Sequence, residues 1–587
     1  MRKATAALSA AFFLAGTIPT PIFAQDRHDE PFIKHVIVIF NENISFDHYF
    51  ATYPKAENNP GETPFQASWR TPSANTLANP LNPDKFFLPI KGLNLLGDNP
   101  NGPAGSGAAF NGASATNPFR LGPTQAATAD QNHAPKPEQT AYDNGKMDQF
   151  PGSTGTAGPP PSATAASEAA LSKGLTMGYF DGNTVTALWN YAQHFVLFDN
   201  TYTSQFGPSS PGAIDLISGQ TNGIAANTNV LSSSGALLHT SHEVFDNQGG
   251  LTLIGDAEPL GDVCSNTASD NVQMAGKNIG DLLNARGITW GWFQGGFDLQ
   301  LVNANGTTGC ARSTPNVVPG YGGVPQADYV EHHEPFQYYP STANPTHARP
   351  SSVWAIGRTF EADGVTKDPA NHQYDTEDFF TALNNGNLPA VSFLKPPSFE
   401  DAHPGNSDPI DEQTFLVDTI NAVMRSPFWD STAIFITYDD SDGWYDHQMP
   451  PIVDPSFSSY VDVLNAPNVC DAGAQQGHPL TTTPLNGVLG KPVWGRCGYG
   501  TRIPMLIISP LVDANVVDHT LTDQSSIIRF VEDTWLNGER IQPGGSFDSI
   551  AGDVSHLFHG HGPFPPFFPE GRRLILDPTT GAIAEHR

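Results

Sequence analysis

The sequence predicts an α/β fold with a mostly parallel central sheet and helices on both faces. Three observations support this prediction. Short, continuous apolar runs recur along the chain, segments with helical spacing lie between them, and polar clusters directly follow several of the runs. Strands buried on both faces have continuous apolar sequences, and strands that alternate with helices are typical of parallel sheets.

Four segments are predicted to be buried strands, because they are short, apolar and rich in β-branched or aromatic residues: 33–40, 390–395, 432–438 and 504–509. Residues 184–198 are predicted to form an amphipathic helix that runs into a strand, and 412–424 and 525–536 have helical spacing. A Thr-Thr-Gly turn at 579–581 lies between two short apolar segments and predicts a small C-terminal hairpin.

Residues 1–24 are interpreted as a signal peptide. A basic start at Arg2 and Lys3 precedes an apolar run over 6–16, and Ala24 is a small residue at the expected cleavage point. The run is too short to span a bilayer. No later segment is long and apolar enough to do so, and we therefore expect a secreted or periplasmic protein without an integral membrane segment.

The remainder is expected to comprise one large domain, residues 25–560, and a C-terminal tail, residues 561–587, that contains the hairpin. Within the domain, residues 57–170 are rich in Gly, Pro, Ala, Ser, Thr and Asn. This composition packs poorly and predicts a loop-rich insertion.

Acidic residues dominate the charge of the chain. Asp and Glu number 59 against 28 Lys and Arg, which gives a formal net charge of −31. Such a surface repels nucleic acid backbones and anionic lipids, so no nucleic-acid partner is expected. Solubility outside the cell would explain the acidity equally well. A phosphate-ester substrate would need positive charge supplied locally by a metal or by histidines.

The four cysteines are Cys264, Cys310, Cys470 and Cys497. Three pairings are possible, and the sequence does not choose among them. In an exported protein, the simplest expectation is two local disulfides, Cys264–Cys310 and Cys470–Cys497. No two cysteines have the spacing of zinc ligands, which disfavours a zinc site.

Glu42 and Asn43 follow the first predicted strand. Because ligands bind at the carboxyl ends of strands in such sheets, this pair is a candidate metal site, and its hard oxygen ligands suit Mg, Ca, Mn or Fe. The alternative is a helix start in which Asn43 or Ser45 is the N-cap and Asp47 lies in the first turn.

Residues 206–219 contain Gly207-Pro208-Ser209-Ser210-Pro211-Gly212 and then an apolar helical segment. This sequence places a hydroxyl on a rigid turn at a helix N-terminus, where a phosphate is stabilised. An ordinary capped helix is the alternative. Neither the nucleophile-elbow motif G-x-S-x-G nor a Walker A lysine is present, so carboxylesterase and nucleotide triphosphatase chemistry are not supported.

Four aspartates and a histidine in residues 437–447 follow the strand predicted at 432–438. Crowded carboxylates repel one another unless a cation holds them, which favours a metal site over an Asp-rich turn. The EF-hand spacing does not fit. Histidines in polar loops, namely His133, His332, His333 and His403, are candidates to bind phosphoryl oxygens and transfer protons, although a single loop histidine is usually only a surface residue.

Four ordered motifs in residues 31–536 resemble the bacterial acid phosphatase and phospholipase C (phosphoesterase) family of the alkaline phosphatase-like superfamily. They are His35-Val36 with Glu42-Asn43 and 45–50, Gly207 to Pro211, Asp439-Asp440 with Gly443 and Asp446-His447, and 502–510 with 519–526. The resemblance implies an alkaline phosphatase-like core and hydrolysis of phosphoric esters.

The resemblance also implies residue roles. Ser209 is the expected nucleophile, with Ser210 as the alternative. Ser209, Glu42, Asn43, Asp439 and Asp440 are expected to hold one divalent metal ion. His133, His333, His403 and Asn43 are expected to hold the phosphoryl group of the phosphate-ester substrate.

Ser209 and Gly212, the segment 218–221, and His332-His333 before Pro335 resemble the acid phosphatase branch of the family. This branch implies phosphomonoester hydrolysis through a phosphoserine intermediate. The alternatives are a phospholipase C that cleaves the phosphodiester head groups of lipids and an inactive secreted binding protein with the same fold. The last alternative predicts a missing nucleophile or metal ligand, and none is missing.

Overall fold

An eight-stranded sheet runs through the computed structural model, which describes residues 32–81, 95–97, 99–101, 116–156, 172–229, 234–235, 237, 240–315, 325–472, 483–558 and 572–586. The expected signal peptide lies outside the described residues. The strands occur in the order β14 (Gln373–Asp375), β11 (Trp290–Gln294), β15 (Val391–Lys395), β1 (His35–Asn41), β16 (Thr432–Tyr438), β17 (Met505–Ile508), β4 (Val196–Phe198) and β18 (Val516–Asp518).

The sheet is mostly parallel, as predicted. Only β17 runs against its neighbours β16 and β4 among the eight strands described. Each of the four segments predicted to be buried strands coincides with one strand of this sheet, although β1 extends one residue beyond the predicted range, to Asn41. From Val36 to Phe40, β1 is completely inaccessible to solvent. Each buried aliphatic or aromatic side chain of this kind stabilises the fold by about 1.5–3 kcal/mol, which explains the continuous apolar sequence.

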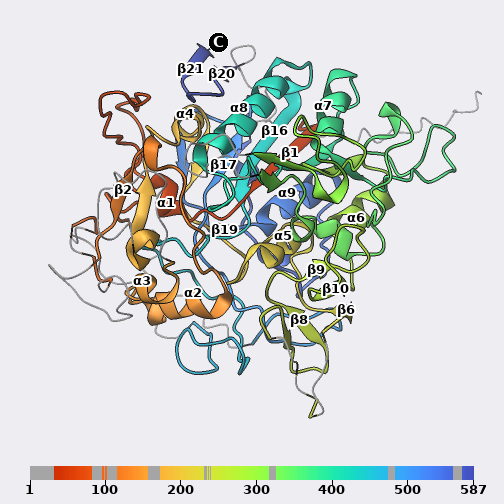
Figure 1. Ribbon diagram of the computed structural model, residues 1–587, viewed down its shortest axis with the longest axis horizontal. Helices are drawn as coiled ribbons and strands as arrows, with labels where there is room; N and C mark the ends of the chain where they lie inside the picture. Colours follow the sequence, from red (N-terminus) through yellow and green to blue (C-terminus); the bar gives the residue numbers. More distant parts are fainter. Residues whose placement is uncertain are drawn as a thin grey trace, which may run out of the picture.

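Helices cover both faces of the sheet (Figure 1). α4 (Thr186–His194) and α8 (Pro409–Arg425) lie on one face, and α5 (Ser209–Ser218) and α9 (Ser525–Trp535) pack together on the other. All four occur where helices were predicted. α8 begins sharply because Asp408 accepts hydrogen bonds from the N–H groups of Ile410 and Asp411 and because Pro409 occupies the first helical position.

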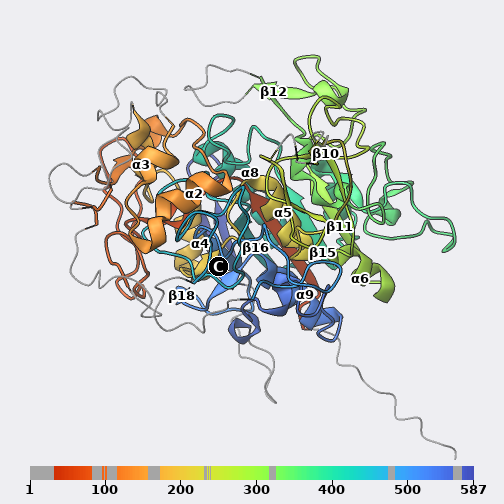
Figure 2. The ribbon, with the colours of Figure 1, turned by 90° about the horizontal axis from the view of Figure 1, so that it is seen from below.

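The segment predicted to be a loop-rich insertion also contains short regular elements. They are β2 (Phe119–Leu121), α2 (Pro135–Tyr142) and α3 (Phe150–Ser153). β2 pairs in parallel with β3 (Gly178–Phe180). α2 and α3 lie at one end of the molecule, whereas α6 (Ile279–Arg286) lies at the opposite end (Figure 2).

Smaller elements surround this core. They are α1 (Phe46–Phe50), α7 (Thr376–Asn384), β5 (Thr201–Tyr202), β6 (Ile224–Asn227), β7 (Glu243–Phe245), β8 (Leu251–Leu253), β9 (Glu258–Pro259), β10 (Asn271–Met274), β12 (Ser313–Pro315), β13 (Pro325–Ala327), β19 (Thr522–Asp523), β20 (Leu574–Leu576) and β21 (Ile583–His586). β20 and β21 pair antiparallel and form the predicted C-terminal hairpin. Within the described parts of the chain, no helix has the length and apolar character needed to cross a membrane.

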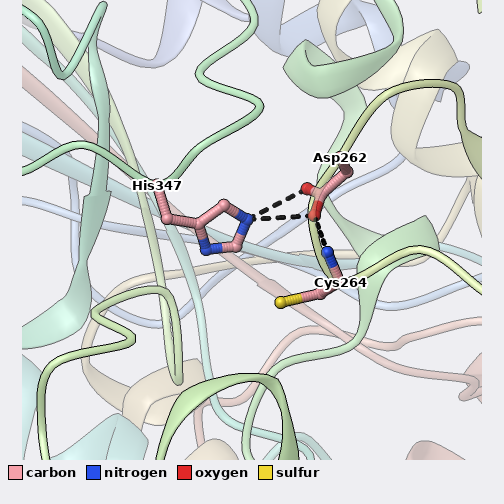
Figure 3. Close-up of side chains that lie close together, drawn as sticks. All are labelled: Asp262, Cys264 and His347. Carbon is pink, nitrogen blue, oxygen red and sulfur yellow. Dashed lines mark hydrogen bonds and ion pairs between the residues drawn. The ribbon is translucent and has the colours of Figure 1, made fainter.

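The predicted disulfides Cys264–Cys310 and Cys470–Cys497 are both present. Beside the first, the buried Asp262 carboxylate accepts hydrogen bonds from the Cys264 N–H, Tyr329 Oη and Gln337 Nε2, and His347 Nε2 lies 3.1 Å from both of its oxygens (Figure 3). The Cys264 sulfur is bonded to Cys310 and the Asp262 carboxylate has protein partners on both oxygens, so the disulfide and these hydrogen bonds account for the cluster.

Candidate active site

The ends of two neighbouring parallel strands bring the predicted metal ligands together. Glu42 and Asn43 follow β1, Asp439 and Asp440 follow β16, and the last residues of the two strands are register partners. The Asn43 N–H donates to Asp439 Oδ1 over 2.9 Å and joins the two segments. Asn43 has φ +61°, a left-handed conformation that asparagine tolerates better than most residues and that turns the chain at the strand end.

The helix-start interpretation of the segment after β1 is confirmed, and it is compatible with a metal site at Glu42 and Asn43. Ser45 is the N-cap of α1, because its Oγ accepts a hydrogen bond from the His48 N–H, and Asp47 lies in the first turn. Glu42 and Asn43 precede the cap and face the other strand end. The cap at Ser45 therefore sets the start of α1, and Glu42 and Asn43 take no part in that cap.

Ser209 is the first residue of α5, and its hydroxyl faces this carboxylate cluster. Ser209 Oγ lies 3.0 Å from Glu42 Oε2, 3.2 Å from Asp440 Oδ2 and 3.4 Å from Asn43 Oδ1. Gly212 permits this approach, since a Cβ on it would come within 2.1 Å of the Asp439 backbone oxygen. Three of the predicted ligands thus surround one hydroxyl.

Ser210, the alternative nucleophile, points elsewhere. Its N–H and its hydroxyl both donate to Asp256 Oδ1, over 2.9 and 3.0 Å. The hydroxyl also lies 3.4 Å from Tyr338 Oη. These contacts separate Ser210 from the carboxylates that surround Ser209.

The donor set fits a divalent cation. Asp439 Oδ2 is buried and has no hydrogen-bond partner among the described residues. One end of the Asn43 amide lies 2.6 Å from Glu42 Oε2 and 3.1 Å from Asp439 Oδ1, and the other end lies 3.2 Å from His403 Nε2. The amide nitrogen would face the carboxylates as a hydrogen-bond donor, whereas the oxygen would face them as a metal ligand. Carboxylate, amide and hydroxyl oxygens are the ligands that Mg²⁺, Ca²⁺ and Mn²⁺ prefer.

Two cationic or potentially cationic side chains adjoin Glu42. Lys395 Nζ contacts Glu42 Oε1, and His333 Nδ1 lies 3.1 Å from the same oxygen. Lys395 was not among the predicted site residues. It is the last residue of β15, next to β1, so a polar residue at the carboxyl end of a buried strand was the available signal.

The pKa values of Asp439 and Asp440 are shifted in opposite directions. Burial acts to raise the pKa of Asp439, but Lys395, His333 and the Asn43 N–H outweigh it and the pKa is lowered. Burial and then the neighbouring Asp439 raise the pKa of Asp440 well above its ordinary value. Two adjacent carboxylates are most easily ionised together when a cation lies between them.

His133 and His403 lie on the loop side of the site, with ring centres 6.4 Å apart. His133 Nδ1 lies 2.9 Å from the Gln131 backbone oxygen and 3.2 Å from Asp442 Oδ1. His403 Nδ1 lies 2.7 Å from the Pro404 backbone oxygen. Protein groups occupy both Nδ1 atoms, and His403 Nε2 lies beside the Asn43 amide, within the candidate site.

The electrostatic surroundings of the histidines differ. Burial acts to lower the pKa of His133, but Asp440 and Asp442 outweigh it and the pKa is raised well above 6.5. Burial, together with the neighbouring His332, lowers the pKa of His333 well below 6.5. The site therefore offers one imidazole that favours the charged form and one that favours the neutral form.

The acidic segment 437–447 divides into three groups and does not form a single metal site. Asp439 and Asp440 face Ser209, and Asp442 pairs with His133. Asp446 and His447 turn away. Arg502 Nε lies 3.1 Å from both Asp446 oxygens, and His447 Nδ1 lies 2.6 Å from Asp47 Oδ2. These buried ion pairs hold the segment in place.

A model of the phosphoesterase family matches residues 33–536 of this chain. The chain belongs to the phosphoesterase family. This confirms the family predicted from the four motifs, and the matched range includes every residue of the candidate site.

Other phosphoesterases are similar over shorter segments. The non-hemolytic phospholipase C of Pseudomonas aeruginosa is 28% identical over 188 residues, which are 31% of this chain and 25% of that protein. Phospholipase C B of Mycobacterium tuberculosis is 26% identical over 156 residues, 26% of each protein. The chain thus matches about a quarter of the length of these relatives.

Solved structures are similar only at a low level. A protein of the alkaline phosphatase superfamily from Vibrio parahaemolyticus has a TM-score of 0.25 and 12% identity, with 67% of each chain covered. A phosphonate monoester hydrolase from Silicibacter pomeroyi has a TM-score of 0.26 and 12% identity, with 63% of this chain and 72% of that chain covered. The α/β fold is defined by the sheet and helices of this chain, and these weak similarities add nothing to it.

Proposed function

We propose that this protein is a secreted or periplasmic, metal-dependent hydrolase that cleaves phosphomonoesters with Ser209 as its nucleophile. The observation that supports this proposal most directly is the position of Ser209 Oγ, within 3.4 Å of Glu42, Asn43 and Asp440. A hydroxyl at a helix N-terminus, surrounded by hard oxygen ligands, suits attack on phosphorus. The signal-peptide pattern and the two disulfides support export.

In the proposed reaction, Ser209 Oγ gives up its proton to solvent and attacks phosphorus, the bond from phosphorus to the leaving oxygen breaks, the leaving oxygen takes a proton from His133, and phosphoserine forms. Water then gives a proton to His133 and attacks the phosphoserine, the bond from phosphorus to Oγ breaks, and inorganic phosphate leaves while Oγ takes a proton from solvent. A divalent cation held by Glu42, Asn43, Ser209, Asp439 and Asp440 would lower the pKa of the serine hydroxyl and neutralise phosphoryl charge. Mg, Ca, Mn and Fe all suit these ligands.

The histidines complete the proposed mechanism. His133 is assigned as the proton donor to the leaving oxygen, since its ion pair with Asp442 favours the imidazolium form. His333, His403 and Asn43 are assigned to hold phosphoryl oxygens. Lys395 is assigned to balance the charge of Glu42.

Two assays test the proposal. Purified protein should hydrolyse p-nitrophenyl phosphate much faster than p-nitrophenylphosphorylcholine. Rapid acid quenching during turnover, followed by peptide mass spectrometry, should find phosphate on the peptide that contains Ser209. Absence of a phosphopeptide under conditions of rapid turnover would contradict the nucleophile assignment.

A phospholipase C is the second candidate, because the relatives named above carry that name. A faster reaction with p-nitrophenylphosphorylcholine would support it in place of a phosphomonoesterase. An inactive binding protein is disfavoured because the proposed nucleophile Ser209 lies beside Glu42 and Asp440, and Asp439 is joined to Asn43.

A further inference from the structure

Glu412, in the first turn of α8, is buried against the carboxyl ends of β1 and β16. Its carboxylate accepts three side-chain hydrogen bonds: from Asn41 Nδ2 to Oε1 over 2.5 Å, from Tyr438 Oη to Oε1 over 2.6 Å, and from Tyr49 Oη to Oε2 over 3.0 Å. Glu412 is 1% exposed and its three donors are 0% exposed. Three buried side chains therefore donate hydrogen bonds to the Glu412 carboxylate and shield it from water.

Two of these donors stand at equivalent points in the sheet. Asn41 is the last residue of β1 and Tyr438 the last residue of β16, and they are register partners. Asn41 is followed directly by Glu42-Asn43, and Tyr438 by Asp439-Asp440. One Glu412 oxygen thus links the two residues from which the proposed metal-binding pairs extend.

We infer that Glu412 is a positioning residue, which fixes the separation of Glu42-Asn43 from Asp439-Asp440 and thereby sets the affinity for the divalent metal. The inference rests on the proposed function, which assigns those ligands. Metal affinity depends on ligand geometry, and loss of a partner that orients ligands typically costs about 10- to 100-fold in affinity. Charge-assisted hydrogen bonds to a buried carboxylate are short and directional enough to provide this restraint.

Tyr49 provides a matched control. It donates to the same carboxylate and is equally buried, but it lies on α1 and no proposed ligand directly follows it. Tyr49→Phe and Tyr438→Phe each remove one hydroxyl. A purely structural role for Glu412 predicts equal consequences for metal binding, whereas a positioning role predicts an effect mainly in Tyr438→Phe.

The test is calorimetric titration of chelator-stripped full-length protein with Mg²⁺, Ca²⁺, Mn²⁺ and Fe²⁺ in turn. For the ions that the wild type binds, Tyr438→Phe should raise the Kd about tenfold, and Tyr49→Phe should leave it within about twofold. Thermal melts of the metal-free proteins should show similar loss of stability in both variants. Glu412→Met is the second variant and should also bind about tenfold more weakly, because its thioether cannot replace the carboxylate oxygen that links Asn41 and Tyr438.

Equal metal affinities in Tyr438→Phe and Tyr49→Phe, or wild-type affinity in Glu412→Met, would overturn the inference while leaving the proposed function intact. A wild type that hydrolyses phosphate esters but binds none of the four ions would instead overturn the proposed metal site, and the inference with it. Should Tyr438→Phe fail to fold, Glu412→Met alone decides between the outcomes.

Discussion

Ser209 Oγ lies 3.2 Å from Asp440 Oδ2, although 231 residues separate the two in the sequence. Ser209 begins a helix on one face of the sheet, and Asp440 follows the strand β16 within it. Burial and the neighbouring Asp439 raise the pKa of Asp440, and a buried hydroxyl beside a carboxyl group of raised pKa is an arrangement typical of active sites.

Replacing the nucleophile should abolish turnover without unfolding the protein. Ser209→Ala removes one hydroxyl and should lower kcat by roughly 10⁴-fold or more. Its free energy of unfolding should change by no more than about 1 kcal/mol. Ser210→Ala is the matched control and should keep kcat within about tenfold, since its hydroxyl faces Asp256. Greater loss in Ser210→Ala would transfer the role to that residue.

Metal binding should depend on Asp440 and not on Asp442, although both are buried and lie on the same turn. Asp440→Asn should reduce bound metal to about a tenth or less at a fixed metal concentration, because a charged ligand is lost. Asp442→Asn should keep full stoichiometry, because its partner is His133. Elemental analysis of the purified variants measures both, and full stoichiometry in Asp440→Asn would exclude that residue as a ligand.

Leaving groups should distinguish His133 from His403. An alkyl phosphate needs a proton on its leaving oxygen, whereas p-nitrophenolate leaves readily without one. His133→Asn should therefore lose at least about tenfold more activity with glycerol phosphate than with p-nitrophenyl phosphate. His403→Asn should lose similar factors with both. The reverse pattern would assign proton donation to His403.

The alkaline limb of the wild-type pH–rate profile should lie above pH 6.5, because nearby carboxylates raise the pKa of His133 and keep it protonated at higher pH. Asp442→Asn removes one of these carboxylates and should shift the limb about one unit toward lower pH. A limb that stays in place in Asp442→Asn would show that His133 does not control it.

Glu138 should make the folded protein less stable as pH rises. Burial raises its pKa from 4.5 to about 7, despite hydrogen bonds from Ser441, Thr501 and the Gly207 N–H. A group with a raised pKa in the folded state contributes stability that is complete below pH 4.5 and lost as pH rises through 7. The loss is on the order of 3 kcal/mol. Glu138→Gln should therefore flatten the decrease in Tm between pH 5 and 8, and an unchanged slope would contradict this assignment.

Much of the fold was predictable because local chemistry and tertiary environment agree. The segment 432–438 is continuously apolar because both of its faces are buried, and the observed strand has the same bounds. Four residues could be proposed for the site from the sequence because they directly follow buried strands, and ligands of such sheets bind at the carboxyl ends of the strands. They are Glu42, Asn43, Asp439 and Asp440.

Other site residues depend on three-dimensional contacts that the sequence does not display. Asp442 has φ +55°, and this left-handed turn directs it to His133 and away from the preceding pair. Glu412 has an ordinary acidic position in the first turn of a helix, and only the packing of α8 against two strand ends and α1 gives it three donors. Lys395 required knowledge of which strand lies next to β1.

The proposed metal ligands and the site histidines lie on different kinds of structure. Four of the proposed metal ligands extend from adjacent strand ends in the rigid sheet, whereas His133 and His403 lie on connecting segments outside helices and strands. Loops accept insertions and substitutions far more readily than buried strands. Directed evolution of this protein toward new substrates should therefore accumulate its changes in the connecting segments that flank His133 and His403, and leave the two histidines and the residues after β1 and β16 unaltered.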